Sequence, residues 1–120
     1  MTFDAILSAI LNDCGHGLGA ALMGPDGIAI EQIEVAGEPQ VDPVALGVEF
    51  GRILSETRKA ADAVGAGSVE ELVVSAAGFW VALRMLDDEN FLLLALSPEA
   101  NLGKARFVLR RYAASIRAEL

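Results

Sequence analysis

The fold is decided by residues 42–64, DPVALGVEFGRILSETRKAADAV. Asp42 followed by Pro43 favours the start of a helix, because aspartate caps free backbone N–H groups and proline is pre-organised for the first helical position. At about 100° per residue, the larger apolar side chains gather on one face. That face consists of Leu46, Phe50, Ile53, Leu54, Thr57, Ala61 and Val64. The pattern predicts a helix of about six turns that docks by this face on a sheet of its own chain.

A stripe of small residues runs beside the apolar face. It consists of Gly47, Gly51 and Ser55, with Val44 and Val48 alongside. Two glycines inside a helix cost about 1 kcal/mol each relative to alanine, so a close neighbour is expected to offset that cost. We expect this neighbour to be a second copy of the chain, which predicts a homodimer. A helix that merely tolerates glycine, or a loop that crosses it, is the alternative. The remaining arc of the helix carries Glu49, Arg52, Glu56 and Lys59.

The composition favours a single soluble domain over residues 1–120. The chain is 53% hydrophobic, yet its longest uncharged apolar run, 91–96, is far shorter than the roughly 20 residues that span a membrane. Its one cysteine, Cys14, cannot form an internal disulfide, and no secretory signal is visible, so we expect a cytoplasmic location.

The net charge of −8 is unevenly distributed. Residues 1–50 contain eight acids and no lysine or arginine, whereas residues 51–120 hold nine acids and nine bases. Nucleic acid and anionic membranes would be repelled by the acidic half, so we expect neither as a partner and no membrane insertion. A basic patch on another protein is an acceptable partner.

The rest of the chain alternates between helical and strand patterns. Apolar spacing of three and four predicts helices, and runs of β-branched and apolar residues bounded by turn residues predict strands. The predicted helices are 3–14, 42–64 and 102–119, and the predicted strands are 17–23, 28–35, 69–76, 79–86 and 91–96. The first two strands form a hairpin around Gly24-Pro25-Asp26-Gly27, where glycine supplies a left-handed turn position.

Several strings in this order resemble the roadblock/dynein light-chain family, in particular its bacterial MglB-like branch. The hairpin string 24–30, GPDGIAI, is similar to the turn between the family's first two strands, and the passage from Ser97-Pro98 through 101–106, NLGKAR, resembles its last strand-to-helix junction. The resemblance covers essentially the whole chain. It implies an α+β fold with roadblock (profilin-like) topology. A five-stranded antiparallel sheet of order 2-1-5-4-3 would carry the long helix on one face and the first and last helices on the other.

The resemblance also implies a homodimer and a partner. The third strand, with its apolar Leu72, Val73 and Val74, would meet its two-fold mate, and the long helices would lie side by side. Without such pairing, so apolar an edge strand favours aggregation. Family dimers are platforms, many of which bind a small Ras-like GTPase, and the MglB-like members stimulate its GTP hydrolysis. On this chain the exposed docking residues would be Glu49, Arg52, Glu56 and Lys59, assigned by helical position.

Residue types that carry chemistry are sparse, and we expect no catalytic, cofactor-binding or metal site. The string 15–20, GHGLGA, fits G-x-G-x-x-A, but a helix precedes it and a strand follows, the reverse of a dinucleotide site, so we interpret it as a turn. Cys14 and His16 form a conceivable nucleophile pair that lacks an evident orienting residue. The run 87–89, Asp-Asp-Glu, is interpreted as a solvated hairpin tip, although it resembles a cation-binding cluster.

Four functions remain open from the sequence. The first is a dimer that regulates a GTPase, by holding the partner's own residues in position rather than by an arginine finger from Arg52 or Arg58. The second is a scaffold or adaptor dimer with no role in GTP hydrolysis. A small-ligand sensor and an enzyme in its own right are the third and fourth.

Overall fold

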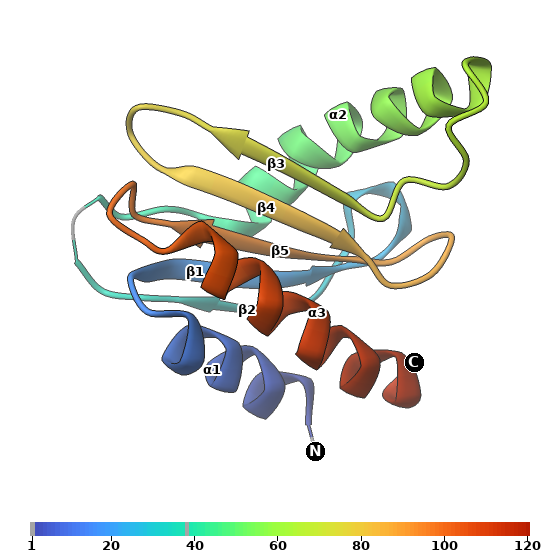
Figure 1. Ribbon diagram of the computed structural model, residues 1–120. Coiled ribbons are helices and arrows are strands. Elements are labelled where there is room, and N and C mark those ends of the chain that lie inside the picture. The colour runs from blue at the N-terminus through green and yellow to red at the C-terminus, as the bar shows by residue number, and fades with distance from the viewer. Residues whose placement is uncertain (1, 38) are drawn as a thin grey trace.

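The computed structural model of the chain describes residues 2–37 and 39–120 and places helices on both faces of one sheet (Figure 1). Its helices and its short 3-10 turn are α1 Phe3–Cys14, η1 Pro25–Gly27, α2 Pro43–Ala63 and α3 Leu102–Glu119. Its strands are β1 Gly17–Met23, β2 Ala29–Glu34, β3 Glu71–Ser75, β4 Trp80–Met85 and β5 Phe91–Leu96. All eight predicted helices and strands are therefore present, and β2, β3 and β4 are one or two residues shorter at each end than predicted.

The sheet order is β2-β1-β5-β4-β3, and every neighbouring pair is antiparallel. The predicted order 2-1-5-4-3 is thus confirmed. Helix α2 lies on one face of the sheet, and α1 and α3 lie side by side on the other, as Figure 1 shows. The two edge strands are β2, which is acidic, and β3, which is apolar.

Local sequence signals explain where the helices begin. The Asp42 carboxylate accepts hydrogen bonds from the backbone N–H groups of Val44 and Ala45, and Asn101 caps α3 in the same manner through the N–H of Lys104. These contacts satisfy donors that a helix start leaves without partners. In the first hairpin turn Gly27 has φ of +75°, which confirms the predicted left-handed glycine.

The core has two layers separated by the sheet. Beneath α1 and α3 the buried residues include Ile6, Leu94 and Leu109, and beneath α2 they include Met23, Leu83 and Leu93. Every residue of β5 is buried, because helices cover this central strand on both sides.

Helix α2 docks largely by the predicted face, because Leu54 is buried and Leu46 and Phe50 are partly buried against the same core. The face differs from the prediction at Gly47, Ile53 and Val64. The residues that it buries are Pro43, Gly47 and Leu54, whereas Ile53 is 47% exposed and Val64 is 79% exposed. A Cβ atom on Gly47 would lie 2.7 Å from Sδ of Met23, and one on Gly51 would lie 3.1 Å from the Phe91 ring.

The prediction that the glycine stripe needs a second chain is therefore corrected. The close neighbours of Gly47 and Gly51 are large side chains of β1 and β5 in the same chain. The missing side chains of the two glycines therefore leave room for the side chains of Met23 and Phe91. Gly19 of β1 shows a similar close approach, because a Cβ there would lie 2.7 Å from Cγ of Pro43 at the start of α2.

Candidate functional site

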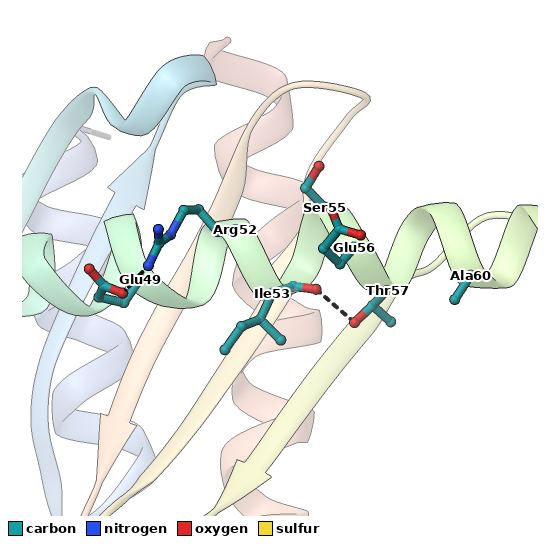
Figure 2. Close-up of a pocket in the computed structure, with 7 residues that line it drawn as sticks. All are labelled: Glu49, Arg52, Ile53, Ser55, Glu56, Thr57 and Ala60. Carbon is teal, nitrogen blue, oxygen red and sulfur yellow. Dashed lines mark hydrogen bonds and ion pairs between the residues drawn. The ribbon is translucent and has the colours of Figure 1, made fainter.

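The candidate site is the outward surface of α2, which we call the α2 ridge. A shallow surface hollow of about 700 Å³ lies along it, and Figure 2 shows its lining. The lining residues are Glu49, Arg52, Ile53, Ser55, Glu56, Thr57 and Ala60. All seven come from one regular helix, so their relative positions follow from helical spacing alone.

Two ion pairs organise the polar part of the α2 ridge. Arg52 pairs with Glu49, and the ammonium of Lys59 lies 3.2 Å from a carboxylate oxygen of Glu56. Each side chain is between 64% and 74% exposed, so water screens both pairs and they contribute little to folding stability. Such pairs can exchange partners at low cost when a protein with complementary charges approaches.

An apolar side chain stands next to these charges. Ile53 is about half exposed and points toward the side of the sheet that carries β4 and β3 (Figure 2). The hydroxyl of Thr57 donates to the Ile53 carbonyl at 2.8 Å, which removes a polar group from the same surface. The α2 ridge therefore combines charges of both signs with one apolar contact point, a combination typical of protein–protein interfaces.

The four predicted docking residues, Glu49, Arg52, Glu56 and Lys59, do lie together and exposed on this surface. Sequence reasoning missed Ile53 and Thr57 because it placed both on the face toward the sheet, and it assigned Ala60 to no face. The large side chains of Met23 and Phe91 on β1 and β5 could have indicated how α2 docks. A sheet surface with large side chains packs well against a helix face that carries small residues.

The predicted dimer residues are not all brought together. Val48 lies on the flank of α2 near the hairpin turn, where a Cβ on Gly27 would approach its Cγ2 to 3.4 Å. Leu72, Val73 and Val74 are half-buried on β3, at the far edge of the sheet. Gly47 is covered by its own sheet. A shared role of the α2 flank and β3 in a dimer interface stays a prediction.

The Cys14–His16 pair lacks the electrostatics of a nucleophile. The Cys14 thiol is 2% exposed, and burial raises its pKa above the ordinary value, which keeps it protonated. Its Sγ lies 3.6 Å from the Leu11 carbonyl, as a small buried apolar residue would. His16 is exposed with φ of +56°, and it forms the helix-to-strand turn with Gly15.

The acidic tip at 87–89 is organised by its own backbone. The Asp87 carboxylate accepts hydrogen bonds from the N–H groups of Glu89 and Asn90 at 2.8 and 2.7 Å. The bond from Glu89 lowers the pKa of Asp87. Within residues 2–37 and 39–120, no three His, Cys, Asp or Glu side chains gather closely enough to hold a metal ion. Over the same residues, no helix is long and apolar enough to cross a bilayer.

A five-stranded antiparallel sheet of this order, with one helix on one face and two on the other (Figure 1), defines a domain of the roadblock (profilin-like) fold. Known structures support that class. MglC from Myxococcus xanthus is 32% identical, with 100% of both chains covered and a TM-score of 0.71. A Roadblock/LC7 domain from Streptomyces avermitilis is 17% identical, with 99% of this chain and 98% of that chain covered and a TM-score of 0.86.

The gliding protein MglB from Thermus thermophilus is also similar, at 19% identity and a TM-score of 0.85, with 96% of this chain and 85% of that chain covered. No protein-family model and no curated protein sequence matches the chain. The identity with MglC over the full length shows the family. The chain belongs to the roadblock family, in its MglB-like branch.

Proposed function

We propose that this protein is a homodimeric platform that binds a small Ras-like GTPase and stimulates its GTP hydrolysis. The observation that carries the proposal is the α2 ridge, a pre-formed surface of exchangeable ion pairs around the half-exposed Ile53. Membership of the roadblock family supplies the class of partner. The proposal places the protein in the cytoplasm, where Ras-like GTPases and GTP are found.

The dimer part of the proposal rests on β3. This strand ends the sheet and leaves one row of backbone N–H and C=O groups without a neighbouring strand. Three consecutive apolar residues, Leu72, Val73 and Val74, stay half-buried there. Pairing with the β3 strand of a second copy would satisfy the backbone and cover these side chains. The participation of Val44, Val48 and Ser55, which lie on α2, stays a prediction.

The mechanism that suits this surface is positioning rather than chemistry. Arg52 belongs to a regular helix and is held by Glu49, and Arg58 donates to the Asp88 carbonyl at 3.1 Å. An arginine finger has to reach the partner's phosphates, which a loop does more readily than a helix flank. We therefore assign the α2 ridge the task of holding the partner's own catalytic residues in a hydrolysis-competent arrangement.

The test uses the small Ras-like GTPase of the same organism. Single-turnover GTP hydrolysis is measured with and without this protein, for the wild type and for Arg52→Glu and Glu56→Arg. We expect acceleration by the wild type and a loss of about tenfold or more for each charge reversal, since rim charges govern productive encounter. Arg111→Glu, a reversal on α3 at the opposite face of the sheet, is the matched control and should keep full activity.

The outcomes separate the two leading functions. If the protein binds the GTP-bound and GDP-bound GTPase equally well and does not accelerate hydrolysis, it is not an activator. That result would indicate an adaptor dimer. Equal activity of the wild type and both α2 variants would show that the partner docks elsewhere.

A further inference from the structure

The solvent-facing side of α3 is a second charged surface, which the proposed function does not use. This helix carries five of the nine lysines and arginines of the chain and one acid, Glu119. Its net charge is +4, whereas the rest of the chain carries −12. So strong a separation of charge along one exposed helix sets up a local positive potential on an acidic molecule.

The five cations of α3 differ in whether they have a partner among the residues that the structure describes. Arg106 pairs with Glu71, and Nε of Arg117 donates to the Leu86 carbonyl at 2.9 Å. Among the residues that the structure describes, Lys104, Arg110 and Arg111 form no ion pair. The guanidinium of Arg111 instead lies 5.6 Å from the centre of the Tyr112 ring. These three charges are therefore available to a binding partner.

An exposed aromatic residue stands among the free cations. Phe107 is 62% exposed, although large apolar residues usually leave water when a helix packs. At 100° per residue it shares the outward side of α3 with Lys104 and Arg111, about half a turn away from the buried Leu109. An exposed aromatic residue with cations on either side is typical of the residues that anchor protein–protein interfaces.

We infer that this face of α3 docks an acidic segment of another protein, with Phe107 as the apolar anchor. The positive charge of the face favours an acidic partner, and the exposed Phe107 favours an apolar side chain on that partner. The helix is about 27 Å long, so the segment that it accommodates is short.

The surrounding charge argues against extended polyanions. A bilayer or a nucleic acid extends beyond α3, where it is repelled by the net charge of −12 on the rest of the chain. Screening extends only about 8 Å at physiological salt, so a segment confined to α3 feels mainly the positive face. A short acidic peptide keeps the attraction and avoids the repulsion.

The experiment uses a synthetic helical peptide of about 18 residues, a length that matches α3, built from glutamate with leucine on one face. Binding to the isotope-labelled protein is followed by chemical-shift changes. We expect saturable changes confined to α3. Phe107→Ala should weaken binding about tenfold, as loss of an aromatic anchor does, and Arg111→Glu about fivefold or more. Arg52→Glu on α2 is the matched charge reversal and should bind as the wild type does.

Two further measurements decide between classes of partner and exclude a folding defect. Phosphatidylserine vesicles and duplex DNA are titrated under the same conditions, and tighter binding of either than of the peptide would overturn the inference. Shifts outside α3, or unchanged affinity of Phe107→Ala, would overturn it as well. Unaltered melting temperatures of Phe107→Ala and Arg111→Glu would show that a loss of binding arises at the surface. If either variant melts early, the decision rests on whether the wild-type shifts map to α3.

Discussion

At single positions, the tightest constraint lies where α2 meets the sheet. Gly47 leaves room for Met23, whose Sδ, Cε and Cγ would all lie within 2.8 Å of an added Cβ. Gly47→Ala gains about 1 kcal/mol of helix propensity but overpacks a buried site, which costs about 1–3 kcal/mol. We expect a net loss of about 1 kcal/mol in the free energy of unfolding, measured by urea denaturation.

Gly103→Ala in α3 is the matched control for this prediction. A Cβ there would meet nothing closer than Oδ1 of Asn101 at 3.5 Å, so the same exchange should stabilise by about 0.5 kcal/mol. Stabilisation by Gly47→Ala would contradict the close approach of α2 to Met23. A smaller loss in the background of Met23→Val would support it, because the shorter side chain relieves the overlap.

Cys14 should make stability fall at alkaline pH. Burial raises its pKa, so above the ordinary value of 9.0 the unfolded chain loses this proton while the folded chain keeps it. The stabilising contribution is complete below that pH and declines as the pH rises toward the folded pKa. The slope attributable to Cys14 is at most about 1.4 kcal/mol per pH unit.

The measurement compares the wild type with Cys14→Ala under reducing conditions between about pH 8 and about pH 10.5. The free energy of unfolding should decline more steeply for the wild type. Tyr112, whose pKa is raised by its hydrogen bond to Asp13, contributes equally to both proteins. Parallel curves would show that the Cys14 thiol is not protected by burial.

Among the strands and helices, the two sheet edges should behave differently. Val74→Lys places a charge on the apolar edge β3, and we expect sedimentation at micromolar concentration to show a monomer, because the strand can no longer pair with its mate. Ile30→Lys on the opposite edge β2 is the matched control, since Ile30 is already 42% exposed, and it should stay dimeric. A wild-type monomer, or a dimer that survives Val74→Lys, would contradict pairing through β3.

One ion-pair network joins β3, β4 and α3. Glu71 accepts from Arg84 at 3.3 Å and also pairs with Arg106, and the Glu71 and Arg84 side chains are only 9% and 13% exposed. Glu71→Gln leaves the charge of Arg84 largely buried without a counter-charge, which should cost about 2–3 kcal/mol in unfolding free energy. Glu49→Gln in the exposed pair on α2 should cost less than about 0.5 kcal/mol. Equal effects in a denaturant titration would mean that the network is solvated.

For the molecule as a unit, its charge predicts two opposite responses to salt. Two copies of net charge −8 repel each other, so the proposed dimer should tighten as sodium chloride rises from about 0.02 M to about 0.2 M. Binding of the acidic peptide to α3 should weaken over the same range. Sedimentation measures the dimer affinity and titration measures the peptide affinity. If salt changed both affinities in the same direction, the result would contradict the separation of charge between α3 and the rest of the chain.

Local signals were enough to predict the helices, the strands and the first hairpin turn, because caps, turn glycines and apolar periodicity act between residues that are near in sequence. The sheet order and the layers followed from family resemblance. The docking face of α2 was derived only in part, because Leu46, Phe50 and Leu54 pack on the sheet as predicted but Ile53 and Gly47 do not follow the prediction. Large apolar residues on a helix normally indicate its buried side, yet here Ile53 is half exposed and Gly47 is buried.

The amino-acid order was therefore sufficient for the elements and for the exposed charges Glu49, Arg52, Glu56 and Lys59, since both depend on spacing along the chain. The three-dimensional packing alone determined that Gly47 and Gly51 also turn toward the sheet while Ile53 stays half exposed. It also determined which cations of α3 form ion pairs with other residues that the structure describes. The reason is that a close contact depends on the combined volume of two surfaces. The bulk of Met23 and Phe91 lies on strands distant in sequence from the glycines that accommodate it.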